Sequence, residues 1–262
     1  MHKVEPFDIA MTETTVSQFL EFLRATGNRH FWNEAEKQFA MHKHCPASRN
    51  LGWYDVARFC NWLTDQENER REASGSGANP LRYCYEPLDI GNYGHGVNLV
   101  EGADGFRMPT LLEWEYACRA GSHARWSFGD NPDLLPQYAR YYDNSSELTW
   151  PVGSCMPNAY GLFDMHGNVL EFCHDVYRVE ISQNGESVSV PPCLTNERFE
   201  VNASSRFAAS GGDLYKRSLL TVTRRIELKQ PTSKRPGNFG YIGVRIARSA
   251  PERTTDDLTA DR

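Results

Sequence analysis

The chain has 262 residues, of which 40% are hydrophobic and 12% aromatic, so it can bury a full core and is too apolar for intrinsic disorder. Its 28 basic and 34 acidic side chains give a net charge of −6, which argues against broad, sequence-independent binding to nucleic acid or to an anionic membrane. No stretch approaches the roughly 20 apolar residues of a membrane span, and the N-terminus lacks the pattern of a secretory signal. We therefore expect a soluble, cytoplasmic chain with no nucleic-acid partner and no membrane segment.

The seven cysteines are scattered singly, at positions 45, 60, 84, 118, 155, 173 and 193. An odd count without a Cys-x-x-Cys pair fits reduced thiols better than a disulfide framework, and we expect most of them to be small buried groups. The segment from His42 to Cys45 contains two histidines and a cysteine, which are zinc ligands elsewhere. No second ligand pair follows at a usual spacing, so a polar loop is favoured there.

Two helices are predicted early in the chain. The first covers residues 15–26, because Thr15 and Gln18 have the spacing of a capping box, the apolar side chains share one face, and Gly27 is a natural terminator. The second covers Tyr54 to Thr64, where apolar residues recur at intervals of three and four.

A third helix and a series of short strands are predicted later. The helix starts with the capping box of Thr110 and Glu113 and stops at Gly121. From residue 126 onward, Gly, Pro, Asn and Asp interrupt short apolar runs such as Ile242 to Ile246. This pattern indicates short strands joined by long loops.

Six segments, taken together and in order, resemble the formylglycine-generating enzyme (sulfatase-modifying factor) domain family. They are TETTVSQFLEFL, NLGWYDVARFCNWL, FRMPTLLEWEYACRAG, PVGSCMPNAYGLFDMHGNVLEF, SGGDLYKR and GYIGVRIAR. The resemblance implies a single α+β domain over residues 1–248, with a C-type-lectin-like fold that is rich in loops and has little regular secondary structure. Residues 249–262 are charged and poor in large apolar side chains, so we expect a disordered or linker-like tail.

Two short stretches of the sequence resemble a subgroup that is common in planctomycete-type bacteria. They are Cys84-Tyr85-Glu86 and the segment from Ala117 to Gly121. Members of that subgroup are often fused to serine/threonine protein kinases. The resemblance therefore implies a kinase domain on the same chain as one partner.

Active members of the family carry a cysteine pair just after a Gly-Gly-Ser turn, bind copper there and oxidise a substrate cysteine. In this chain Gly211-Gly212-Asp213 matches the turn, and the cysteine positions fall at or near Lys216 and Thr221. No cysteine follows Cys193. Because neither an ammonium nor a hydroxyl group replaces a thiolate as a ligand of Cu(I), we expect no copper and no catalytic residue of this kind.

The segment from Asp164 to Glu171 places two carboxylates on either side of a turn that contains Gly and Asn. Such a turn can wrap oxygen ligands around a hard cation, although spacing alone favours a turn aspartate and a solvated glutamate. The resemblance implies a structural Ca²⁺ ion held by the side chains of Asp164 and Glu171 and by the backbone carbonyls of Gly167 and Val169. The shortened segment after Arg140 argues against the family's other calcium site.

Basic and aromatic residues gather in the region where active members bind their substrate peptide. The candidate ligand-binding residues are Tyr215, Lys216, Arg217, Arg224 and Arg225. Arginine and aromatic side chains favour recognition, so this region is predicted to form a cleft for an anionic or peptide ligand. The alternative is a solvated basic face above core aromatics.

Three functions follow from these observations. The first is a non-catalytic sensory or interaction domain of a bacterial signalling protein such as a kinase, which binds a protein, peptide or small-molecule ligand of unknown identity. The second is an oxidase of the formylglycine-generating type whose chemistry has moved to other thiols, with Cys155 or Cys173 as candidates. The third is a variable ligand-binding protein of a diversity-generating retroelement, whose lectin-like domain also resembles this family.

Overall fold

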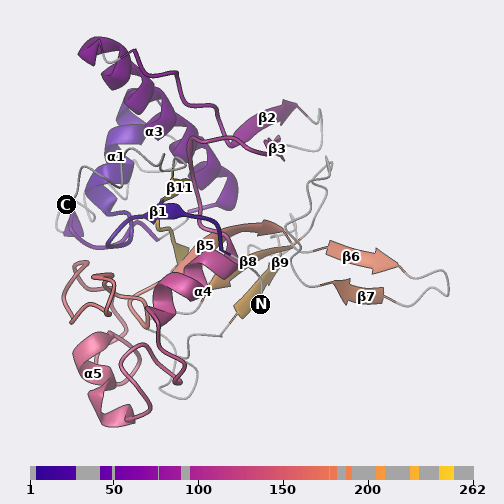
Figure 1. Ribbon diagram of the computed structural model, residues 1–262. Coiled ribbons are helices and arrows are strands. Elements are labelled where there is room, and N and C mark those ends of the chain that lie inside the picture. The colour runs from indigo at the N-terminus through magenta and orange to yellow at the C-terminus, as the bar shows by residue number, and fades with distance from the viewer. Residues whose placement is uncertain are drawn as a thin grey trace, which may run out of the picture.

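The fold combines a few helices with small β-sheets that are joined by long loops (Figure 1). The computed structural model describes residues 4–27, 42–48, 51–75, 77–89, 95–176, 178–181, 187–190, 205–209, 225–229 and 242–250. Within these ranges, helices come early and most strands come late, as the sequence predicts. The expected α+β, loop-rich class is confirmed.

Helix α1 (Val16–Ala25) begins at its predicted cap. The Thr15 hydroxyl accepts a hydrogen bond from the Gln18 backbone N–H at 3.3 Å, and the Gln18 side chain accepts one from the Thr15 N–H at 2.8 Å. These two bonds satisfy backbone donors that would otherwise lack partners at the helix start. The buried face of α1 then packs its phenylalanines against Phe59 of the second helix.

Helix α3 (Trp53–Ser74) starts where predicted and extends well beyond the predicted end at Thr64. Its second half has no apolar stripe, and ion pairs between its own side chains stabilise it instead. Glu67 pairs with Arg70 at 2.7 Å and with Arg71 at 3.0 Å, one turn further along. Pairs at these spacings support exposed helical turns, and hydrophobic periodicity does not detect them.

Helix α4 (Leu111–Arg119) has the predicted capping box. The Thr110 N–H donates to Glu113 Oε2 at 2.8 Å, and the Glu113 N–H donates to the Thr110 hydroxyl at 3.2 Å. The helix ends at Arg119, and its C-cap is Ala120, one residue before the predicted stop, because Ala120 itself adopts the left-handed conformation at φ 48°. A short 3-10 turn (Pro132–Leu134) and helix α5 (Leu135–Tyr138) follow.

The first and last described strands lie side by side in a three-stranded antiparallel sheet. Strand β11 (Ala247–Ser249) is central, with β1 (Phe7–Ile9) and β4 (Phe106–Arg107) on either side. Ser249, which the sequence analysis assigns to the tail, pairs with Phe7 in this sheet. The remaining tail residues, 251–262, lie outside the described ranges.

A second sheet has the strand order β10-β5-β8-β9, in which only β10 and β5 run parallel. Its strands are β10 (Ile242–Gly243), β5 (Leu170–Val176), β8 (Ser205–Ala209) and β9 (Arg225–Lys229). The predicted strand from Ile242 to Ile246 is wrong in extent, since the chain leaves the sheet after Gly243 and turns Arg245 into the core.

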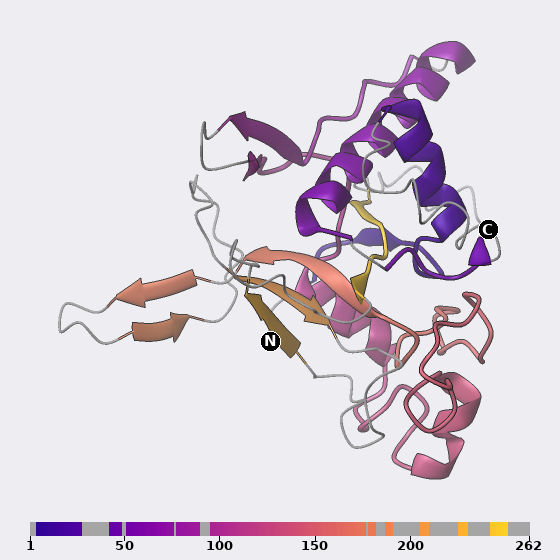
Figure 2. The same ribbon diagram turned by 180° about the vertical axis from the view of Figure 1, so that it is seen from behind.

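Two further strand pairs are antiparallel and stand apart from these sheets. Strands β2 (Tyr85–Asp89) and β3 (His95–Leu99) lie against α3. Strands β6 (Arg178–Ile181) and β7 (Ser187–Val190) project away from the rest of the molecule, as the view from behind shows (Figure 2).

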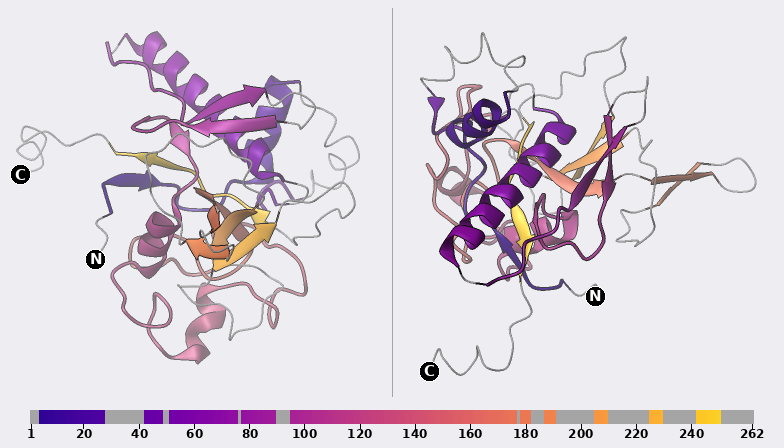
Figure 3. Two further views of the ribbon diagram at one scale, coloured as in Figure 1. Left: turned by 90° about the vertical axis from the view of Figure 1, so that its right-hand side faces the viewer. Right: turned by 90° about the horizontal axis from the view of Figure 1, so that it is seen from above.

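The core is divided into several apolar clusters. One cluster joins α3 to the strand pair β2–β3 and the start of β5, and another packs α4 against Leu162, Met165 and Cys173. The views in Figure 3 show α1 and α3 on one side of the β1–β11 sheet and the α5 region on the other. Arg245, with none of its surface exposed, lies among these layers and positions the site described next.

Candidate functional site

A buried ion pair joins the start of β5 to the C-terminal part of the chain. Glu171 is 1% exposed and Arg245 is fully buried. The Arg245 guanidinium donates to both oxygens of Glu171, at 2.9 to 3.2 Å, and the Trp114 indole N–H donates to Glu171 Oε2 at 2.7 Å. Burial alone would lower the pKa of Arg245, but the attraction of Glu171 raises it above its usual value. Arg245 therefore remains charged in the core.

Two other buried carboxyl groups lie beside this pair. Glu13 is 1% exposed and Asp164 is 2% exposed, and their carboxyl groups contact each other. Asp164 Oδ2 accepts a hydrogen bond from the Gly153 N–H at 2.6 Å. Burial, followed by the charges of Asp164 and Glu171, raises the pKa of Glu13 well above its usual value.

Three oxygens of these two carboxyl groups have no hydrogen-bond donor among the described residues. They are both carboxyl oxygens of Glu13 and Oδ1 of Asp164. A buried polar atom without a partner is rare in native proteins and commonly marks an ion or a water. The oxygen chemistry suits a hard cation such as Ca²⁺.

The predicted calcium-binding residues lie on the loop that leads into β5 and, for Glu171, at the second residue of that strand. Asp164 adopts a positive φ of 62°, and the backbone of Gly167 lies so close to Arg140 that an added Cβ would meet the Arg140 carbonyl oxygen at 2.2 Å. The described residues contain no group of three or more His, Cys, Asp or Glu side chains placed to hold a metal ion. Because Arg245 and Trp114 already engage the Glu171 oxygens, any Ca²⁺ ion would take its side-chain ligands from elsewhere in this centre.

When bound there, Ca²⁺ would supply positive charge and fixed coordination for otherwise repelling carboxylates. The side-chain oxygens open to it belong to Asp164 and Glu13, and the carbonyls of Gly167 and Val169 are the predicted backbone ligands. The calcium site remains a prediction.

The predicted ligand-binding cleft falls almost entirely outside the described residues. Tyr215, Lys216, Arg217 and Arg224 are not among them, and Arg225 is described only as the first residue of β9. Convergence of these five side chains therefore remains a prediction, as does the environment of Thr221.

The described thiols are unsuited to nucleophilic or redox chemistry. Cys45, Cys60, Cys84, Cys118 and Cys173 are buried, and Cys155 is half-buried. Burial raises the pKa of Cys84 to about 11 and also raises the pKa of Cys155. Because a thiolate is the reactive form, these environments favour inert structural thiols. Five of the six described cysteines are buried, as the sequence predicts.

The early His-Cys segment forms no metal site among the residues that the structure describes. His42 and His44 are exposed, whereas Cys45 is buried and donates a hydrogen bond to the Thr149 carbonyl at 3.7 Å. The polar-loop interpretation remains a prediction.

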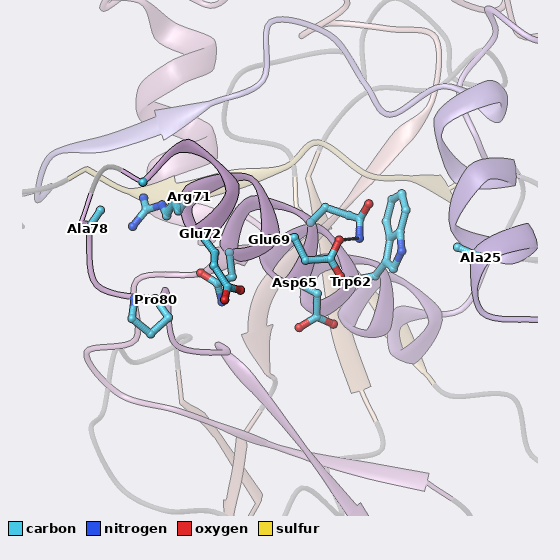
Figure 4. Close-up of a pocket in the computed structure, with 12 residues that line it drawn as sticks. Ala25, Trp62, Asp65, Glu69, Arg71, Glu72, Ala78 and Pro80 are labelled. Carbon is cyan, nitrogen blue, oxygen red and sulfur yellow. Dashed lines mark hydrogen bonds between the residues drawn. The ribbon is translucent and has the colours of Figure 1, made fainter.

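Sequence reasoning missed a surface groove along the second half of α3. Figure 4 shows that Trp62, Asp65, Glu69 and Glu72 follow one side of the helix, between α1 and the segment that ends at Pro80. The groove has a volume of about 860 Å³. A helix that ends at residue 64 does not include most of the residues that line this groove. The charged pairs that follow, at spacings i,i+3 and i,i+4, are the sequence signal that indicates a longer helix.

No helix among the described residues is long and apolar enough to cross a membrane.

Comparison with known proteins extends these observations. The chain is 29% identical to the formylglycine-generating enzyme of Streptomyces coelicolor over 197 residues, which are 66% of this chain and 59% of that protein. It is 34% identical to the serine/threonine-protein kinase pkn1 of Chlamydia caviae over 143 residues, which are 54% of this chain but 21% of the kinase. The chain thus spans less than two thirds of either relative.

Among solved structures, Treponema denticola variable protein 1 superposes with a TM-score of 0.64 and 26% sequence identity. The match covers 93% of this chain and 84% of that protein. The model of the sulfatase-modifying factor enzyme 1-like domain matches residues 1–250. Together with the six ordered segments and the mixed, loop-rich fold, this match shows that the chain belongs to the sulfatase-modifying factor (formylglycine-generating enzyme-like) domain family.

Proposed function

We propose that this domain is a non-catalytic binding module of a larger bacterial signalling protein. The observation that carries the proposal is the replacement of the family's cysteine pair. Lysine and threonine stand at or near the two positions, at Lys216 and Thr221, and no cysteine follows Cys193. Without two thiolates the domain has no soft ligand set for Cu(I), and oxidation of a substrate cysteine has no carrier.

The thiols elsewhere in the chain support the same proposal. Cys173 has none of its surface exposed, and its thiol donates to the Glu171 carbonyl at 3.8 Å. Cys155 is more accessible, but burial raises its pKa, so the thiolate is disfavoured. Relocated chemistry at either residue is therefore the weaker alternative.

Similarity to kinases supports the proposed signalling context. The matched part is about a fifth of the length of the Chlamydia caviae kinase, so the similarity concerns a domain and not the whole protein. A kinase of Chlamydia pneumoniae is similarly 31% identical over 145 residues. We infer that this domain accompanies a kinase and supplies binding specificity to it.

A second candidate function rests on a different observation. The match to the Treponema denticola variable protein covers 93% of this chain. That breadth supports a ligand-binding protein that presents its C-terminal surface to varied partners. The proposed ligand-binding residues Tyr215, Lys216, Arg217, Arg224 and Arg225 lie in that part of the sequence under either function.

The decisive experiment compares oxidase chemistry in the natural chain and in a variant with restored cysteines. Purified protein, loaded with Cu(I) and supplied with oxygen, is incubated with a Cys-x-Pro-x-Arg peptide, and the aldehyde product is sought by mass spectrometry. We expect no conversion and no stoichiometric copper binding by the natural chain. The Lys216→Cys/Thr221→Cys variant should gain copper binding, although turnover also requires an organised site. Conversion of the peptide by the natural chain would refute the proposal.

Binding is tested separately with a fluorescent, glutamate-rich peptide as the probe of an anionic ligand. The Arg224→Ala/Arg225→Ala variant should weaken binding by more than about 1 kcal/mol if the two arginines anchor the ligand. Arg24 and Arg58 are exposed on α1 and α3, so their double alanine variant is the matched control for a loss of two positive charges. Equal losses in both variants would indicate nonspecific attraction.

A further inference from the structure

The buried centre around Arg245 holds more acidic groups than basic ones. Three carboxyl groups, those of Glu13, Asp164 and Glu171, surround a single guanidinium group, and each of the four side chains is at most 2% exposed. Arg245 binds Glu171 through both carboxylate oxygens. The other two carboxyl groups therefore have no comparable counter-charge among the described residues. Buried charges in proteins are normally paired or bound to a metal.

The contact between Glu13 and Asp164 sharpens this imbalance. Their carboxyl groups lie within hydrogen-bonding reach of each other, yet oxygens of both lack a donor. Two carboxylate oxygens repel each other unless a proton or a cation lies between them. A proton or a cation is therefore part of this centre.

Backbone hydrogen bonds hold the Asp164 carboxylate and the chain next to Glu13. The Gly153 N–H holds Oδ2 of Asp164 at 2.6 Å, which leaves Oδ1 as the free oxygen. Next to Glu13, the Thr14 N–H donates to the Val244 carbonyl and the Thr14 carbonyl accepts from the Ala47 N–H, both at 2.8 Å. Ligands held in this way are suited to a bound ion.

We propose that Glu13 and Asp164 together bind a divalent cation of the Ca²⁺ class, while Glu171 stays paired with Arg245. The assignment differs from the ligand set that the family resemblance implies, in which Glu171 is the second carboxylate. Ca²⁺ prefers carboxylate and carbonyl oxygens, and both are present here. The proposal concerns the scaffold and does not depend on the proposed binding function.

The test measures the melting temperature at pH 7 in EDTA and then with increasing Ca²⁺. A ligand that binds only the folded state raises the melting temperature, by about 5 °C for a domain of this size when Ca²⁺ is near one hundred times its dissociation constant. The Glu13→Gln variant should lose this rise. In EDTA it should melt at or above the temperature of the natural chain, because the substitution removes the repulsion with Asp164. That result also shows that the variant folds.

Glu21→Gln is the matched control, since Glu21 is an exposed carboxylate on α1 and its loss should leave the response to Ca²⁺ unchanged. Luminescence of Tb³⁺ excited through tryptophan provides a second measurement, and the signal should fall at least tenfold in both Glu13→Gln and Asp164→Asn. A Ca²⁺ response that survives Glu13→Gln but not Asp164→Asn would overturn the proposal in favour of the family's ligand set. No response of the natural chain to Ca²⁺ would overturn it in favour of a shared proton.

Discussion

Arg245 binds the carboxylate of Glu171, a residue 74 positions earlier, inside a part of the core from which solvent is excluded. Nη1 of the guanidinium donates to the Ala10 carbonyl at 2.9 Å, and Nη2, which also binds Glu171, donates to the Phe163 carbonyl at 2.8 Å. One side chain thus joins three segments that are far apart in the sequence. Its role is structural, and the loss of either member of the pair would leave the other charged and unpaired.

Arg245→Met should therefore destabilise the domain by about 3 to 5 kcal/mol, because Glu171 would remain buried without its counter-charge. The free energy of unfolding in urea measures the loss. Arg248→Met is the control: Arg248 pairs with Asp8 at 3.2 Å, but the Asp8 side chain is 63% exposed, so the expected loss is below about 1 kcal/mol. Similar losses for the two variants would contradict the buried-pair account.

The pair of Arg107 and Glu113 predicts a dependence of stability on pH. Burial favours a raised pKa for Glu113, but two 2.7 Å contacts from Arg107 and the Thr110 N–H outweigh it and lower the pKa. The folded state therefore binds this proton less tightly than the unfolded chain does. Its stabilising effect is complete above the unfolded pKa of about 4.3 and is lost as the pH falls through the folded pKa.

Glu113→Gln should thus cost about 3 to 5 kcal/mol at pH 7 and progressively less below about pH 4, as urea unfolding across a pH series will show. Glu115→Gln serves as the comparison, since Glu115 pairs with Arg119 across one turn of the same helix at a more exposed position. We expect that variant to lose less than about 1 kcal/mol. A constant loss for Glu113→Gln at every pH would rule out the proposed linkage.

Gly167→Ala should be strongly destabilising, by about 3 kcal/mol or more, because the added Cβ would meet backbone atoms of Arg140 at 2.2 to 2.9 Å and backbone cannot move aside cheaply. Gly161→Ala isolates conformational strain, since Gly161 has a positive φ of 78° but open space around its Cβ position. About 1 kcal/mol is expected there. Thermal melting of both variants provides the measurement, and equal losses would show that the close contact is unimportant.

Thiol labelling provides a test of the core. In a Cys193→Ser background, Cys155 should react with Ellman's reagent before any of the five buried cysteines, and slowly, because burial raises its pKa. Adding Cys155→Ser should abolish labelling until the domain unfolds. Rapid reaction of two or more thiols per chain in the folded protein would contradict the observed burial.

The features that could be predicted from the sequence are those that neighbouring residues determine. The caps of α1 and α4 depend on side chains three residues apart, so Thr15 with Gln18 and Thr110 with Glu113 are recognisable without the fold. The extent of α3 was underestimated because its second half depends on surface ion pairs and not on an apolar stripe. Its groove was missed for the same reason.

The buried charged centre could not be derived in the same way. In the sequence, Glu13 looks like any solvated acidic residue that precedes a helix. It becomes buried only when the fold brings residues near 164, 171 and 245 together. The calcium prediction for Asp164 and Glu171 came from resemblance to a family. The pairing of Glu171 with Arg245 is a long-range consequence of how β5 and the C-terminal segment meet.

The neighbouring positions of β1 and β11 have a consequence for biosynthesis. Arg245 reaches the Ala10 carbonyl across 235 residues, so β1 must wait for nearly the whole domain to be translated before its partner exists. At about 5 to 20 residues per second, that delay is on the order of 10 to 50 s. Throughout it, the edge of β1 lacks its partner strand, and Glu171 lacks its counter-charge while the last 74 of these residues are added. The nascent chain therefore carries an unpaired strand edge, which favours misfolding, until β11 emerges.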